Sequence, residues 1–302
     1  MPVEPFALHT DKECPFAGIV TLTLEQPGKP VVVLDHDLIR RIEATIKQVP
    51  TDARGFVLAS AAPRAFIAGA DLNAIQQMND EQLHAYLQYA SRVFGMISQL
   101  PCPTVAAING AVLGGGMEIA MHCDALVAAP PPERDSAPGK PYPVGLPESG
   151  LSICPGWGGT NLLPARMDPA SAIELTASGK PLNFATACEA GVFDAVASDA
   201  TTLLMTAKQW IIDNPKAPAR DGTPSRWIGR SQYRAKTLTA LDAVRASLPD
   251  TGSAKAVADA VDVGIAQGWE AALKCEQDHL VRLRSSPEGK AAIEAFFARS
   301  KA

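Results

Sequence analysis

The stretch AAINGAVLGGGMEIAMHCDALVAA (residues 106–129) indicates the fold class and holds the first candidate for chemistry. A short apolar run, 105–108, ends at an Asn-Gly turn, which is typical of a buried strand. The glycines from Gly114 to Gly116 have no Cβ, so the backbone can bend sharply and bring its N–H groups close to a bound group. A helix follows, and its unpaired N-terminal amides favour negative charge. The pattern predicts strand, glycine turn, helix and strand, with the chemistry of an oxyanion hole at the turn.

Glu118 is the carboxylate of this helix, and its neighbours in sequence are apolar. A glutamate on a helix is usually solvated, but these neighbours predict that Glu118 is buried. His122, in the same helix, is expected to have a structural role. The glycine run has a purely structural alternative, which is close packing of the helix on the strand.

Two further blocks accompany this stretch, RAFIAGADL (64–72) and VGLPESGLSICPGWGGTNLLP (144–164). The first is a glycine turn followed by an acid at the expected start of a helix, and the second contains Glu148. The three blocks, in this order and at this separation, resemble the crotonase (enoyl-CoA hydratase/isomerase) superfamily. The resemblance is closest to the hydratase portion of the alpha subunit of the fatty-acid oxidation multifunctional enzymes.

The resemblance implies an α/β fold, with a crotonase-like ββα spiral core and a C-terminal helical region. The core with the active site is expected in residues 1–200, and an oligomerisation or linker region in 201–302. Alternation of apolar strand and amphipathic helix patterns in the first part of the chain is consistent with an α/β fold. The resemblance also implies homotrimers, often paired into hexamers.

The resemblance assigns roles to individual residues. The amides of Ala70 and Gly115 would donate to the thioester oxygen. Glu148 would be the proton donor, and Glu118 would orient and help to activate the water. The GxGxxG and GxxxxGK[ST] phosphate motifs are not satisfied by the glycines after Glu148, so nucleotide triphosphate chemistry is poorly supported.

Coenzyme A is expected near the first block, at Arg64, Ala68 and Asp71. Asp71 has an alternative reading as a helix N-cap, and Arg64 as a solvated surface residue. The family lines its acyl pocket with the region that corresponds to residues 71–100 of this chain. Candidate wall residues there are Ile75, Met78 and Phe94, although core packing is the favoured interpretation for each of them singly.

The preferred function is that of an enoyl-CoA hydratase, a hydro-lyase that adds water to trans-2-enoyl-CoA and gives 3-hydroxyacyl-CoA. One alternative is Δ3,Δ2-enoyl-CoA isomerase, which needs only one proton-shuttling carboxylate. Another is a non-catalytic acyl-CoA-binding or RNA-binding member of the same fold. Both glutamates and the glycine turn are present, which favours the hydratase.

The composition of the chain limits the classes of partner that it is expected to bind. The chain has 302 residues, 47% of them hydrophobic, and a formal net charge of −5, so it has no general attraction to nucleic acid or to an anionic membrane. The sequence shows no signal peptide and no long apolar run, which predicts a cytoplasmic protein. No dinucleotide fingerprint is present, so a following dehydrogenase step is expected from a separate 3-hydroxyacyl-CoA dehydrogenase.

Cofactor and metal sites are not expected, and coenzyme A enters only as part of the substrate. The six cysteines lack CxxC or Cys/His metal spacing and are expected to be reduced, three of them in apolar surroundings. A proline-rich segment, 130–143, is expected to form a surface loop that precedes Glu148 and either shapes the site's mouth or is neutral.

Patterns elsewhere predict further elements. Asp35 is a plausible N-cap for an amphipathic helix over 36–49, and 55–62 is expected to be a buried strand. The C-terminal apolar faces predict one helix over 253–284 and another over 288–300.

Overall fold

The computed structural model describes residues 3–132 and 139–300, and the residues in contact group into two units. Unit 1 comprises residues 1–70, 92–144 and 182–225, and unit 2 comprises residues 71–91, 145–181 and 226–302. Each unit is assembled from three separate segments, so neither coincides with the ranges 1–200 and 201–302. The division of roles between those two ranges therefore stays a prediction.

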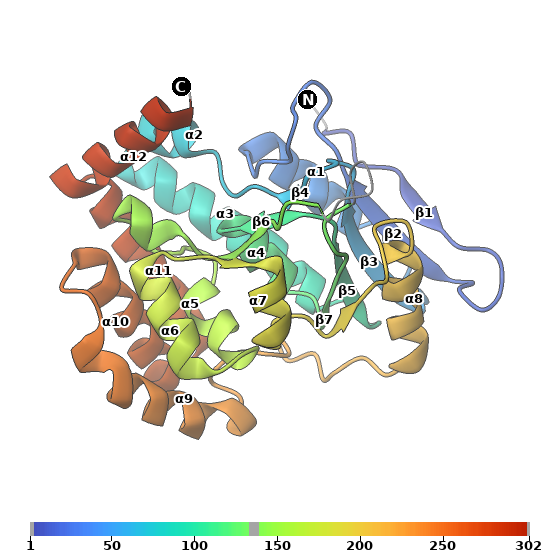
Figure 1. Cartoon of the computed structure of the whole chain (residues 1–302). Helices are drawn as coiled ribbons and strands as arrows, with labels where there is room; N and C mark the ends of the chain where they lie inside the picture. Colours follow the sequence, from blue (N-terminus) through green and yellow to red (C-terminus); the bar gives the residue numbers. More distant parts are fainter. Residues whose placement is uncertain (1–2, 133–138, 301–302) are drawn as a thin grey trace. The chain divides into compact units, whose positions relative to one another are not determined.

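Unit 1 contains a six-stranded sheet (Figure 1). Its strands, in spatial order, are β1 (Leu8–Thr10), β2 (Ile19–Leu24), β3 (Gly55–Ser60), β5 (Thr104–Ile108), β7 (Ala125–Ala128) and β10 (Ala195–Val196). β1 pairs with β2 in antiparallel orientation, and every other neighbouring pair is parallel. The predicted strands at 105–108 and 125–129, and the α/β class, are confirmed.

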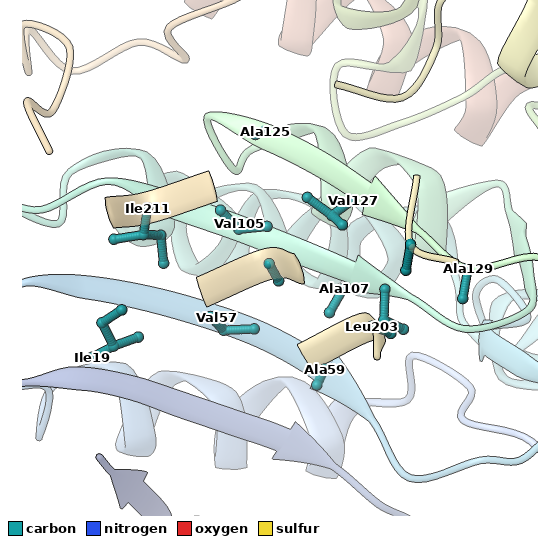
Figure 2. Packing of buried hydrophobic residues seen from close by; sticks show 12 residues of the cluster. Ile19, Val57, Ala59, Val105, Ala107, Ala125, Val127, Ala129, Leu203 and Ile211 are labelled. Carbon is teal, nitrogen blue, oxygen red and sulfur yellow. The ribbon is translucent and has the colours of Figure 1, made fainter. Parts of the chain in front are cut away.

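Both faces of the central strands β3, β5 and β7 are buried, as expected of parallel strands, whose sequences read as continuous apolar runs. On one face, alternate residues of the strands pack against helix α8 (Leu203–Asp213), as Figure 2 shows. The helix contributes Leu203, Ala207 and Ile211, which lie one turn apart on one side. Gly55 allows this approach, because a Cβ there would lie 2.4 Å from Cγ2 of Ile211.

A second, four-stranded sheet carries the two glycine turns that the sequence analysis singles out. Its spatial order is β4 (Ala65–Ile67), β6 (Ala111–Leu113), β8 (Pro143–Gly145) and β9 (Leu182–Asn183). The remaining helices of unit 1 are α1 (His36–Ile46), α4 (Gly115–Met121) and α7 (Phe184–Glu189). Asp35 caps α1 as predicted, because its carboxylate accepts from the Leu38 amide at 2.8 Å.

An ion pair in unit 1 joins distant parts of the chain. Arg220 donates from both terminal nitrogens to the carboxylate of Asp124, each at 2.8 Å, and also to the carbonyls of Leu100 and Cys102. The carboxylate also accepts from the amide and hydroxyl of Thr104, at the start of β5. The side chain of Asp124 is 4% exposed and that of Arg220 is 14% exposed. This pair therefore fixes the loop after α8 against the central strands.

Unit 2 is helical. Its elements are α2 (Leu72–Gln77), most of α3 (Asp80–Ser98), η1 (Glu148–Leu151), α5 (Gly159–Leu162), η2 (Leu163–Ala165), α6 (Pro169–Ser178), α9 (Ser231–Val244), η3 (Arg245–Ser247), α10 (Gly252–Gln267), α11 (Trp269–Arg284) and α12 (Pro287–Ser300). The boundary between the units falls within α3. Figure 1 shows α10 and α11 in orange and red, and the two helices pack against each other.

The predicted single helix over 253–284 is wrong. The chain forms two helices, α10 and α11, which are separated at Gly268. Gly268 has a φ of +98°, a conformation that glycine adopts freely and that ends α10. The amphipathic pattern continues across the break, because both helices bury apolar faces, and it therefore does not reveal the break.

The cysteines and the helices agree with what the composition predicts. All six cysteines are free, and Cys102, Cys123 and Cys154 are buried, as predicted. Within the described ranges, every helix is too short or too polar to cross a membrane. The segment 130–143 includes residues 133–138, which lie outside the described part of the chain, so the expected loop is not tested there.

Candidate active site

Two backbone turns lie together in unit 1. β4 and β6 are parallel neighbours, so the segments that leave their carboxyl ends emerge at the same edge of the sheet. Ala70 follows β4 and Gly115 follows β6. Gly69 has a φ of +110°, and a Cβ on it would lie 3.5 Å from the Leu113 carbonyl oxygen. The two turns are therefore neighbours, as the oxyanion-hole prediction requires.

The glycine run after β6 is needed for this approach. Gly114 precedes α4 with a φ of +52°, which an L side chain rarely adopts. A Cβ on Gly116 would lie only 2.3 Å from the carbonyl oxygen of Ile67 in β4. Close packing, the structural alternative for the glycines, is thus present, and it places the N-terminus of α4 against the end of β4.

The amides of Ala70 and Gly115 are the two predicted oxyanion donors. Among the described residues, neither amide donates to a main-chain carbonyl. Gly115 is the first residue of α4, where helical geometry leaves the N–H group without an internal partner. Two neighbouring amides of this kind can stabilise negative charge on an oxygen. Their action on a thioester stays a prediction.

Glu118 lies within α4, which packs against β5 and β7 in unit 1. Its amide donates to the Gly114 carbonyl at 2.9 Å, so the residue belongs to the first turns of the helix. Glu118 is 1% exposed, which confirms the predicted burial. The carboxyl group is thus held three residues after Gly115, on a helix whose position is set by the glycines.

His122 caps the C-terminus of α4 and has the structural role that was expected. Its Nδ1 lies 3.2 Å from the Ser98 hydroxyl, which also donates to the His122 carbonyl oxygen. Its ring contacts Phe94 edge to face, with 6.0 Å between the ring centroids. Phe94 is fully buried in this contact, so core packing accounts for its position.

Glu148 begins the 3-10 helix η1 in unit 2. The pKa of its carboxyl group is raised from 4.5 to about 8: burial raises it, a hydrogen bond from the residue's own amide lowers it, and the negative charge of Glu276 makes a smaller contribution that raises it. Its Oε2 atom is inaccessible and makes no hydrogen bond to the described part of the protein. A carboxyl group of this kind is protonated at neutral pH and can act as an acid.

The position of Glu148 is fixed by the loop geometry around it. η1 ends at Ser152 in the left-handed conformation, and the Ile153 amide donates back to the Glu148 carbonyl at 3.2 Å. α6 ends at Gly179, whose missing Cβ would lie 2.0 Å from the Gly150 amide nitrogen. η1 therefore packs directly on the end of α6, and a side chain at Gly179 would displace it.

The predicted site residues divide between the units. Ala70, Gly115 and Glu118 belong to unit 1, and Glu148 belongs to unit 2. The oxyanion turns and Glu118 are thus brought together within one unit. The meeting of Glu118 with Glu148 stays a prediction.

The candidate coenzyme A residues have ordinary local roles that leave their predicted function open. Arg64 and Ala68 are exposed, and the Ala68 amide donates to the Val32 carbonyl at 2.8 Å. Asp71 caps α2 by accepting from the amides of Asn73 and Ala74. The N-cap reading of Asp71 is confirmed. Contact of these three residues with coenzyme A stays a prediction.

The two other candidate wall residues lie at α2. Ile75 is 2% exposed, and Met78 caps the helix C-terminus. Arg284 of α11 donates to the carbonyl oxygens of both residues, as well as to the Asp80 carboxylate. Arg284 thereby holds the end of α2 in unit 2, whichever ligand the segment contacts.

Glu276 was missed by the sequence analysis. It lies on α11, is completely buried, and accepts three hydrogen bonds from Gly158 and Thr160. Burial raises the pKa of its carboxyl group to about 7, against the lowering effect of these hydrogen bonds. The available signal was the start of α5, a Gly-Gly-Thr turn that needs an acceptor.

A group of possible metal ligands was also missed. Atoms of Asp259, Cys275 and His279 lie within 4.8 Å of one another, because the last two are one helical turn apart on α11. Nε2 of His279 lies 2.7 Å from the Asp259 carboxylate, and Arg282 donates to Nδ1 of the same histidine. Ordinary hydrogen bonds thus account for this cluster. The expectation that the protein needs no metal stays a prediction.

The chain is similar to a known protein family in sequence and to several solved structures in fold. The sequence profile of the enoyl-CoA hydratase/isomerase family matches residues 16–219. The structure of an enoyl-CoA hydratase from Bacillus anthracis is similar, with 24% identity, coverage of 97% of this chain and 96% of that chain, and a TM-score of 0.58. The enoyl-CoA hydratase from Bacillus halodurans has 19% identity, coverage of 95% and 99%, and a TM-score of 0.64.

A third structure, an enoyl-CoA hydratase/isomerase from Pseudoalteromonas atlantica T6c, has 19% identity, coverage of 98% of each chain and a TM-score of 0.63. At these identities the structures establish a common fold.

Proposed function

Because the chain belongs to the enoyl-CoA hydratase/isomerase family, we propose that it is an enoyl-CoA hydratase, which adds water to trans-2-enoyl-CoA and yields 3-hydroxyacyl-CoA. Its α/β core and helical C-terminal region are those of the crotonase fold. The observation that carries the proposal is that both predicted positions hold a carboxyl group with little access to solvent: Glu118 is buried, and Oε2 of the half-buried Glu148 is inaccessible. Hydration needs two such groups, whereas isomerisation needs one.

The first requirement of the reaction is stabilisation of the enolate. Attack of water on C3 moves electron density to the thioester oxygen. The amides of Ala70 and Gly115 are proposed to donate to that oxygen, and they are already oriented by the glycine turns. Loss of one oxyanion donor typically raises the barrier by about 3 to 4 kcal/mol.

The second requirement is movement of two protons. Glu118 is proposed to orient the water and to accept its proton as oxygen bonds to C3. Glu148 is proposed to give its own proton to C2, the carbon next to the thioester. The raised pKa of Glu148 supports this direction, because the group is protonated before the reaction begins. The atoms of one water molecule are thereby added, and the two carboxyl groups have exchanged protonation states.

The proposal extends to binding and assembly. The adenosine phosphates of coenzyme A are proposed to lie near Arg64, Ala68 and Asp71. The C-terminal helices are proposed to join three chains, or six, and the product is proposed to pass to a separate 3-hydroxyacyl-CoA dehydrogenase. Coenzyme A is part of the substrate in this scheme.

The test is a comparison of two activities of the same preparation. The wild-type protein is mixed with crotonyl-CoA and with a longer trans-2-enoyl-CoA, and loss of the enoyl absorbance is followed. In parallel, a 3-enoyl-CoA is supplied and its conversion to the 2-enoyl isomer is measured. We expect hydration to be the faster reaction. Isomerisation without hydration would assign the chain to isomerases, and binding of acyl-CoA without either reaction would make it a binding protein.

A further inference from the structure

Three side chains of different chemistry meet between α10 and α11, two helices of unit 2 that pack against each other (Figure 1). Asp259 lies in the middle of α10, and Cys275 and His279 lie one turn apart on α11. One oxygen, one sulfur and one nitrogen atom of these residues all lie within 4.8 Å of one another. Carboxylate, thiolate and imidazole groups all bind metal ions, so the three atoms can be compared with the ligands of a single ion.

The spacing of these atoms is close to that around a tetrahedral zinc ion. Zinc bonds of about 2.0 to 2.3 Å at tetrahedral angles place neighbouring ligand atoms about 3.4 to 3.6 Å apart. Sγ of Cys275 lies 3.4 Å from Oδ2 of Asp259, and Nε2 of His279 lies 2.7 Å from the same oxygen. The sulfur and oxygen atoms already have the required separation, and the nitrogen and oxygen atoms need to move apart by about 0.7 Å. Hydrogen bonds therefore hold the three atoms, without a metal, within reach of one ion.

The cluster can be reached from solvent. The side chain of Asp259 is 55% exposed and that of His279 is 20% exposed, and Cys275 is half-buried. Asp259 also lines a surface cavity of about 470 Å³, formed by α10, η3 and the segment between them. The two basic residues of this cavity, Arg245 and Lys255, are each paired with an aspartate of its lining. An ion held by the three side chains would take water as its fourth ligand, as open zinc sites do.

The ligand set selects the class of ion. Mg²⁺ and Ca²⁺ take oxygen ligands, so the nitrogen of His279 and the sulfur of Cys275 disfavour both ions. Zinc takes sulfur, nitrogen and carboxylate oxygen ligands, usually four in number. Two ligands one turn apart on a helix are also the arrangement by which the H-E-x-x-H motif binds zinc. The chemistry of the three side chains therefore fits Zn²⁺.

Arg282 is the residue that opposes a metal at this position. It is exposed on α11, and its guanidinium lies 3.0 Å from Nδ1 of His279. A guanidinium only donates, so Nδ1 accepts, and the proton of the neutral ring sits on Nε2, which donates to Asp259. A metal at Nε2 needs that proton on Nδ1, where it would face another donor. Arg282 must therefore turn away into solvent before the ion can bind.

We propose that Asp259, Cys275 and His279 form a binding site for Zn²⁺, and that Arg282 weakens this site by competing for His279. The bound ion would join α10 to α11, because its ligands come from both helices. Binding releases the thiol proton of Cys275 to solvent and moves the ring proton of His279 from Nε2 to Nδ1. None of these residues takes part in the proposed hydration, for which no metal is expected, so the two proposals stand or fall separately.

The direct test is a titration of the full-length, metal-free protein with Co²⁺, which accepts the same ligands as zinc and, unlike zinc, absorbs light. We expect a thiolate-to-cobalt charge-transfer band that saturates at one equivalent and disappears when Zn²⁺ is added. Cys275→Ser should lack the band. Cys188→Ser, which alters another half-buried free cysteine, should keep it. Absence of a saturable band in wild type, or an equal band in Cys275→Ser, would overturn the proposal.

A second variant tests the ligand on the other helix through the affinity for Zn²⁺, measured by competition with Co²⁺. Asp259→Asn should weaken binding by more than about 10-fold, because loss of an outer partner of a ligand alone typically costs 10- to 100-fold. Asp262→Asn is the matched control, since Asp262 lies one turn further along α10 and is similarly exposed. Its affinity should equal that of wild type. An unchanged affinity in Asp259→Asn would contradict the proposed site even if Cys275→Ser failed to fold.

A third variant tests the competition by Arg282. In Arg282→Gln, the amide oxygen of glutamine can accept from the Nδ1–H group of His279, so Zn²⁺ should bind about 10-fold more tightly than to wild type. Arg234→Gln, at an exposed arginine of α9, is the control and should bind as wild type does. Unchanged or weaker binding in Arg282→Gln would contradict the proposed competition for His279.

Discussion

Glu148→Gln is expected to lower kcat/KM for hydration of crotonyl-CoA by about 10²- to 10⁴-fold, the range typical of a positioned acid or base. The side chain keeps its size and can still be buried, but it has no acidic proton to give to C2. The pKa of Glu148 is raised above its usual value, so the acid form is present below the folded-state pKa and is lost as pH rises through it. Wild-type activity should therefore fall on the alkaline side of about pH 8, and the variant should lack this limb.

Glu118→Gln should cause a loss of similar size, because the buried carboxylate on α4 is proposed to accept the proton of the water. The measurement for both variants is the initial rate of enoyl absorbance loss over a range of pH. Glu174→Gln is the matched control, because Glu174 is an exposed glutamate of α6, and its rate should equal that of wild type. Retention of near-wild-type hydration by either variant at position 118 or 148 would remove that residue from the mechanism.

Arg220→Ala is expected to destabilise the protein by about 3 to 5 kcal/mol, the usual effect of removing one partner from a buried ion pair. The variant leaves the Asp124 carboxylate nearly inaccessible and without its bidentate partner, although the two Thr104 donors remain. It also leaves the Leu100 and Cys102 carbonyls without the guanidinium. The free energy of unfolding in urea measures the effect.

Arg245→Ala is the matched control for this experiment. Arg245 pairs with Asp262 through one terminal nitrogen that donates to both carboxylate oxygens, and the side chains are 46% and 42% exposed. Exposed pairs contribute about 0 to 1 kcal/mol, so this variant should unfold close to wild type. Equal losses of unfolding free energy in the two variants would show that burial does not determine how much the Asp124–Arg220 pair stabilises the protein.

The elements that were predicted from sequence are those whose causes are local. The glycine turn between β6 and α4 depends on residues that are consecutive in the chain, and so do the N-caps at Asp35 and Asp71. Burial of Glu118 was also predictable, because the residues beside it are apolar.

The features that were missed depend on partners far away in the chain. Glu276 lies 118 residues from the Gly158 amide that it accepts from, and Arg220 lies 96 residues from Asp124. An acidic residue on a helix such as α11 is ordinarily interpreted as solvent-exposed, and the residues next to Glu276 in the sequence do not indicate that it is buried. Gly268 was missed for a different reason, since an amphipathic pattern can continue through a glycine that ends a helix.

Product analysis in labelled water tests the central assignment most directly. Wild-type protein is incubated with trans-2-enoyl-CoA in ¹⁸O-water and, separately, in D₂O, and the products are identified by mass spectrometry. Hydration predicts 3-hydroxyacyl-CoA with one ¹⁸O on C3 in the first experiment and one deuterium on C2 in the second. Two results would contradict the assignment of the chain as a hydratase. One is recovery of the enoyl-CoA without label after long incubation with excess enzyme, and the other is a product with a shifted double bond and no ¹⁸O.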